Sequence, residues 1–100
     1  MPDPRIFPIE SANDAFATVG VVSAIALAAN PARADTDFVN DSDTIIYLAR
    51  GNAAVIGSGI RLNPNGGSYH IGLYNLFLGD VYAIATGANS NMTISEGTKP

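Results

Sequence analysis

The sequence predicts an all-β fold, a small antiparallel β-sandwich or jelly-roll-like barrel. Short segments rich in β-branched and aromatic residues recur along the chain, and clusters of Gly, Asn, Asp and Pro separate them at regular intervals. A length of 100 residues corresponds to a single domain. The chain contains no cysteine, so it must fold by core packing or by association with copies of itself.

The N-terminal segment, residues 1–14, differs from the rest of the chain. It holds three of the six prolines and shows neither a helical nor an alternating pattern, which predicts an extended arm. The β-sandwich domain is then expected over residues 15–100. The apolar residues Ile6, Phe7 and Ile9 in the arm either pack back on their own domain or dock on a neighbouring subunit.

Residues 16–35 form an apolar run that ends in Ala32-Arg33-Ala34, the pattern of a secretory cleavage site. A signal peptide needs a positive leader, but acidic residues outnumber basic ones before the run. Polar residues also interrupt it, so a membrane span is not expected. We therefore expect the run to be part of the fold. Residues 19–29 then form two strands or one bent strand, although their alanines leave a helix possible.

The remaining strands follow from their composition and from the turns between them. Residues 44–48 are dense in β-branched and aromatic side chains, and residues 40–43 favour a tight turn. Phe38-Val39 and residues 44–48 are therefore expected to form a hairpin. Further strands are expected at residues 60–62, 69–73, 81–85 and 92–95, with turns at 63–67 and 87–91.

Charge and hydropathy limit the partners. The net charge of −4 opposes binding to phosphate backbones, so nucleic acid is not expected as a partner. Charged residues make up only 14% of the chain and hydrophobic ones 47%, whereas ordinary domains carry about 25% charged residues. Much of the surface is therefore expected to be covered by other protein.

The sequence contains few groups of residues that could act together in catalysis. We therefore expect that the protein is not an enzyme and binds no cofactor. His70 is the only histidine, which leaves a triad with Ser68 or Ser58 as the one nucleophilic option. The Gly-x-Ser-x-Gly elbow is absent, and His70 is expected on the outer face of a strand. The glycines at 51–57 lack the lysine and the helix of a phosphate-binding loop.

Four acidic residues lie close together in the sequence: Asp35, Asp37, Asp41 and Asp43. Oxygen-rich clusters can bind calcium, but the glycine and glutamate positions of an EF-hand loop are not matched. Turn chemistry accounts for Asp41 and Asp43. Asp35 and Asp37 would share one face of a strand, and whether the four bind an ion stays open.

Several segments together resemble a small β-sandwich module of tailed-bacteriophage virion proteins. They are Leu-Ala-Ala-Asn-Pro-Ala-Arg at 27–33 and the strings at 38–48, 58–69, 79–84 and 94–97. The resemblance covers roughly residues 17–97 and implies a capsid decoration (cement) protein, a head fibre or a tail-associated domain. Residues 34–37 depart from it, because such modules more often carry apolar or basic residues there. Arg33 could hold the Asn30-Pro31 turn by binding carbonyls or a carboxylate, and the resemblance suggests Glu96.

The function expected from the resemblance is a capsid decoration protein on the virion surface. It would assemble with itself, as a trimer, and bind the major capsid protein at subunit seams, with no membrane partner. An apolar connector supplies candidate interface residues, provided that it is not a core strand. These residues are Leu73, Tyr74, Leu76, Phe77 and Leu78.

The alternative function is a carbohydrate-binding or receptor-contacting module of a phage head fibre or tail. Small β-sandwiches often present aromatic side chains on which sugars stack, and Tyr47, Tyr69, Tyr74 and Tyr82 are available. The chain has no tryptophan, and tyrosine in strands more often serves cross-strand packing.

Overall fold

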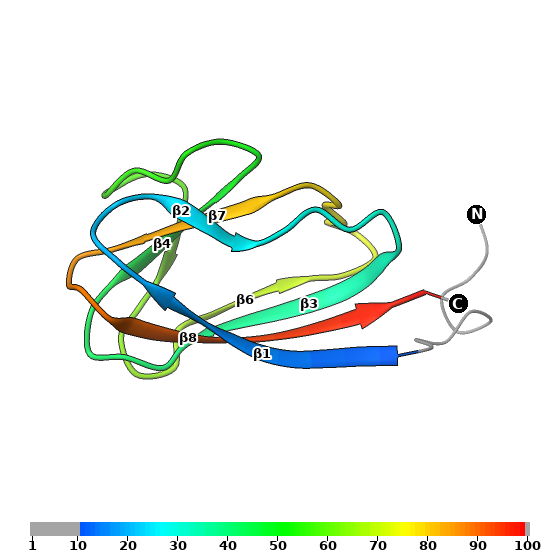
Figure 1. The fold of residues 1–100 in the computed structure, drawn as a ribbon, viewed down its shortest axis with the longest axis horizontal. Coiled ribbons are helices and arrows are strands. Elements are labelled where there is room, and N and C mark those ends of the chain that lie inside the picture. Colours follow the sequence, from blue (N-terminus) through cyan, green and yellow to red (C-terminus); the bar gives the residue numbers. More distant parts are fainter. Residues whose placement is uncertain (1–10, 100) are drawn as a thin grey trace.

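The fold is a sandwich of two four-stranded antiparallel sheets, as Figure 1 shows. The computed structural model describes residues 11–99. The first sheet has the order β1-β8-β3-β6 and the second the order β2-β7-β4-β5. The strands are β1 (Ser11–Val19), β2 (Ala24–Leu27), β3 (Arg33–Asn40), β4 (Ile46–Arg50), β5 (Ile60–Leu62), β6 (Ser68–Ile71), β7 (Val81–Ala85) and β8 (Ser90–Thr98). The all-β sandwich predicted from the sequence is confirmed.

The chain passes from one sheet to the other at almost every connection. Within residues 11–99, β4 and β5 are the one pair of consecutive strands that are also neighbours in a sheet. The expected hairpin of Phe38-Val39 with residues 44–48 is therefore wrong, because β3 lies in the first sheet and β4 in the second. The turn that joins them is a corner of the sandwich, and the buried Asn40 amide donates hydrogen bonds to the Thr44 and Leu62 carbonyls there.

The apolar run at residues 16–35 belongs to the sandwich. It supplies the end of β1, all of β2 and the start of β3, so residues 19–29 contain parts of two strands and no helix. Strands β1 and β2 each lie at the edge of a sheet, β1 beside β8 and β2 beside β7. This pairing overrides the helix preference of the alanines. Strand β1 already begins at Ser11, so residues 11–14 of the expected arm are paired with β8.

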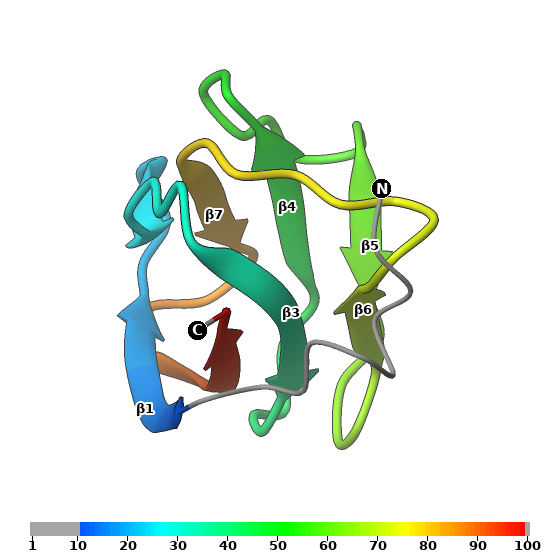
Figure 2. The same cartoon turned by 90° about the vertical axis from the view of Figure 1, so that its right-hand side faces the viewer.

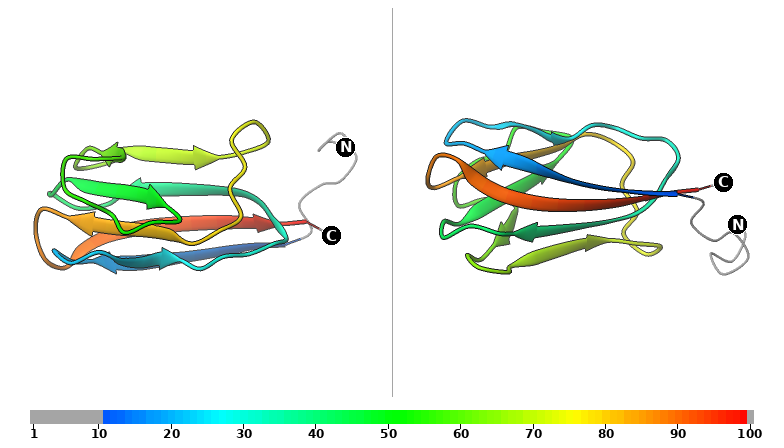
Figure 3. Two further views of the ribbon diagram at one scale, coloured as in Figure 1. Left: turned by 90° about the horizontal axis from the view of Figure 1, so that it is seen from above. Right: turned by 60° about the horizontal axis from the view of Figure 1, so that its bottom comes forward.

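The core fills the space between the two sheets, which lie one above the other in Figure 1 and overlap when they are seen from above in Figure 3. In β7 the side chains of Val81, Ala83 and Ala85 alternate inward, as a strand with one covered face requires. Phe38 on β3 stacks on its cross-strand partner Tyr69, with ring centroids 6.5 Å apart. The buried apolar cluster comprises Val19, Phe38, Ile46, Leu48, Leu62, Ile71, Val81, Ala83, Ala85, Met92 and Ile94.

Candidate functional site

A buried arginine organises one end of the sandwich. The Arg33 side chain is fully buried, and its Nε donates a hydrogen bond to Glu96 Oε2 at 2.6 Å. Its Nη1 donates to the carbonyls of Phe77 and Gly79, and its Nη2 to that of Ala28. The expected roles of Arg33, carbonyl binding and pairing with Glu96, are both confirmed. The arginine thereby ties the 28–32 turn and the 72–80 loop to β3 and β8.

The 72–80 loop is the apolar connector, and it runs across the end of the sandwich from β6 to β7 (Figure 2). Its candidate interface residues divide into two groups. Leu76 and Phe77 are partly buried and pack against the core, whereas Leu73 and Leu78 are exposed and Tyr74 is 98% exposed. Exposed surface for a partner is therefore offered by Leu73, Tyr74 and Leu78. Ile6, Phe7 and Ile9 lie outside the described residues.

This division predicts opposite effects of two substitutions in the same loop. Phe77→Ser should lower the free energy of unfolding by about 1–3 kcal/mol, because it removes a half-buried ring from the core surface. Tyr74→Ser should change it by less than about 0.5 kcal/mol, because its side chain is in solvent. Urea unfolding measures both values, and equal losses for the two variants would contradict the assignment.

An apolar patch that the sequence did not reveal lies on the β2 side of the second sheet. The Ala54 N–H donates a hydrogen bond to Ser23 Oγ at 2.8 Å, which joins the 51–59 loop to the 20–23 turn. Figure 1 shows this loop standing above the second sheet. The exposed aliphatic residues beside that bond define the apolar patch: Val21, Val22, Ile25, Val55 and Ile56. Sequence reasoning missed the patch because its two halves are about thirty residues apart.

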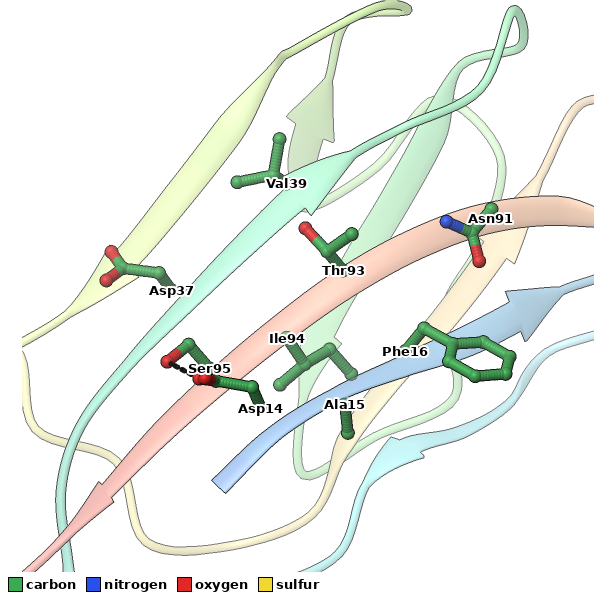
Figure 4. A pocket seen from close by; sticks show the side chains of 9 residues that line it. All are labelled: Asp14, Ala15, Phe16, Asp37, Val39, Asn91, Thr93, Ile94 and Ser95. Atoms are coloured by element: carbon green, nitrogen blue, oxygen red, sulfur yellow. Dashed lines mark hydrogen bonds between the residues drawn. The ribbon is translucent and has the colours of Figure 1, made fainter. Parts of the chain in front are cut away.

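A second candidate surface is a hollow on the outer face of the first sheet (Figure 4). Strand register places Phe16, Thr93 and Val39 in one row across β1, β8 and β3. The next row on the same face holds Asp14, Ser95 and Asp37. Asn91 also lines the hollow.

Hydrogen bonds hold the carboxylates of this hollow. Ser95 Oγ donates to Asp14 Oδ1 at 2.6 Å, the bond drawn in Figure 4. Asp37 Oδ1 lies 2.7 Å from Nδ1 of His70, its partner on β6. Each contact uses one of the two oxygens of its carboxylate.

His70 lies on the outer face of β6, as expected, and is more than half exposed. Its hydrogen-bond partner is Asp37, and within residues 11–99 no serine hydroxyl is bonded to the imidazole. A Ser-His-Asp triad is therefore not assembled in the described part of the chain.

The four clustered acids are dispersed. Asp35 accepts a hydrogen bond from the Gly97 N–H, Asp37 pairs with His70, and Asp41 accepts one from the Asn91 amide. Across residues 11–99 no group of three or more histidine and acidic side chains is placed to hold a metal ion. Turn and sheet contacts account for Asp35, Asp37 and Asp41.

Comparison with protein-family models, with curated proteins and with solved structures found no match to this chain. No helix in the described range of 11–99 is long and apolar enough to cross a membrane.

Proposed function

We propose that this protein is an accessory structural protein of a virion, a capsid decoration protein that binds the shell at subunit seams. The observation that carries the proposal is the apolar patch. It has five exposed aliphatic side chains on two segments that the hydrogen bond from the Ala54 N–H to Ser23 Oγ joins, and Val22 is 76% exposed. Exposed apolar side chains on adjoining segments are typical of protein–protein contact sites.

The placement of the patch suits attachment to a larger assembly. It lies on β2, which is one of the two edge strands of the second sheet, and on the turn and the loop beside β2. These side chains are exposed, so a partner or another copy can cover them without opening the sandwich. The low charge of the chain agrees with this, since charged residues are depleted in the centre of protein interfaces.

The exposed part of the 72–80 loop supplies a separate contact surface. Tyr74 and Leu73 project from the end of the sandwich that Arg33 holds together. A loop fixed by buried hydrogen bonds loses little conformational entropy when it binds. We assign the patch and this loop to contacts with the major capsid protein and with the other copies of a homotrimer.

The experiment measures the mass of the protein in solution by light scattering, and its co-sedimentation with purified empty capsids. The variant V22D/V55D places two charges in the patch and replaces only exposed residues. It should fold normally but lose shell binding by at least about tenfold, because an unpaired charge is costly at a dry interface. The control N52D/S58D adds the same charge at exposed positions and should bind as the unaltered protein does.

A deletion tests the contribution of the arm. It must end at residue 10, because residues 11–14 are paired in β1. Loss of shell binding on this deletion would support an arm that docks on a neighbour. The whole proposal fails if the unaltered protein is monomeric and does not sediment with shells, or if V22D/V55D binds them fully.

A further inference from the structure

We propose that the hollow on the outer face of the first sheet binds a neutral saccharide. This inference does not depend on the proposed function, since it concerns the opposite sheet from the apolar patch. The hollow has a volume of about 570 Å³, which lies within the usual range of small-molecule sites.

An aromatic platform borders this hollow. Phe16 is 70% exposed although it lies in a paired strand, and Figure 4 shows its ring at one side of the hollow, away from Asp14 and Asp37. An exposed Phe on a sheet face gains nothing from burial in the free protein. The C–H face of a pyranose ring would cover it, and stacking on an aromatic face is the usual way in which proteins hold that side of a sugar.

Hydrogen-bonding groups lie in the rows beside Phe16. Thr93 is directly opposite Phe16, and Asp14 and Ser95 form the neighbouring row. Asp14 and Asp37 each have a second carboxylate oxygen that is not used by Ser95 or His70. Sugar hydroxyls donate to carboxylates and accept from hydroxyl and amide groups, and all three types line the hollow.

Charge selects the class of saccharide. Asp14 and Asp37 lie in the hollow, and Asp35 and Asp41 are on or next to β3 beside it. Among the described basic residues, Arg33 is buried against Glu96, Arg50 and Arg61 belong to the second sheet, and Lys99 follows the end of β8 and does not line the hollow. An anionic sugar would meet the carboxylates of Asp14 and Asp37, of which Asp37 is paired with His70, and no arginine or lysine of residues 11–99 lines the hollow. A neutral saccharide is therefore expected, and sialylated, sulfated or uronic glycans are disfavoured.

The test begins with the isolated protein on an array of neutral and anionic glycans. The neutral oligosaccharide that binds most strongly is then titrated by calorimetry. Phe16→Ala should weaken binding by at least about tenfold, whereas Phe16→Tyr, which keeps the ring, should stay within about threefold. Asp14→Asn should weaken it as well, because one acceptor oxygen is replaced by a donor.

Tyr74→Ala is the matched control, because Tyr74 is an exposed aromatic residue that does not line the hollow, and its loss should leave the affinity for the saccharide unchanged. Thermal unfolding of each variant verifies that it is folded. The inference is overturned if no neutral glycan binds, if F16A binds like the unaltered protein, or if Y74A abolishes binding instead. Salt-sensitive binding of a basic peptide, lost in D14N, with no glycan bound would assign the face to a protein partner.

Discussion

Arg33→Met is expected to lower the free energy of unfolding by about 3–5 kcal/mol, the usual cost of removing one member of a buried ion pair. The guanidinium is fully buried, and Glu96 is only 13% exposed. The substitution would leave the Glu96 carboxylate without its partner in a poorly solvated place. It would also remove the donors of the Ala28, Phe77 and Gly79 carbonyls, and each buried acceptor left unpaired adds to the loss. Urea unfolding followed by circular dichroism measures the effect.

Two further variants show whether the loss comes from the buried contacts. Arg61→Met removes an exposed arginine that bonds only to the neighbouring Asn63 side chain among the described residues, and should cost less than about 0.5 kcal/mol. The double variant R33M/E96Q also removes the negative charge of Glu96, which R33M leaves unpaired. It should therefore recover part of the lost free energy of unfolding, although the three carbonyls remain unpaired. A loss below about 1 kcal/mol for R33M would contradict the role assigned to Arg33.

The strands were predictable where local composition decides them. Residues 81–85 alternate between small apolar and larger side chains, and β7 occupies exactly that range. The turn at 63–67 was predictable because Asn65 and Gly66 adopt positive φ angles, which these two residue types tolerate best. Both features depend on a few adjacent residues.

The assignment of strands to sheets was not predictable from local composition. Residues 38–48 read as a hairpin, but the short turn at 41–45 carries the chain from one sheet to the other. Strand β3 pairs with β6 and with β8, and the β8 partner is more than fifty residues away in the sequence, where Phe38 faces Ile94. Pairing at that distance depends on the whole core and not on the turn.

The candidate sites also differ in how far the sequence alone predicted them. The pairing of Arg33 with Glu96 was anticipated from the resemblance to virion modules and is present. The apolar patch and the hollow each combine residues from distant segments. Phe16 is an apolar residue in an apolar run, and only its outward position in β1 distinguishes it from the core residues of that run.

Asn40→Ala is expected to cost about 2–4 kcal/mol, because it removes the side chain that joins the two sheets at their corner. The Asn40 side chain is fully buried. Its Nδ2 donates to Thr44 O at 2.7 Å and to Leu62 O at 3.1 Å, and its Oδ1 accepts from Ser42 Oγ at 2.6 Å. Thr44 lies in the corner, and Leu62 ends β5 of the second sheet. The alanine would leave two carbonyls without these donors and would also leave a small cavity.

Asn40→Asp separates hydrogen bonding from packing, because it keeps the shape of the side chain and exchanges the two-proton donor for an acceptor. Carboxylate oxygens would then face the Thr44 and Leu62 carbonyls, so this variant should be at least as unstable as the alanine variant. Asn52→Ala serves as the control, since that exposed amide makes one long contact to Arg50 O at 3.4 Å, and should stay within about 0.5 kcal/mol. If Asn40→Asp were as stable as the unaltered protein, cavity formation and not the donated hydrogen bonds would explain any loss in the alanine variant. The corner would then be held by its other contacts, among them the backbone bonds from Asn40 N–H to Gly67 O, from Gly66 N–H to Asn40 O and from Asn65 N–H to Ser42 O.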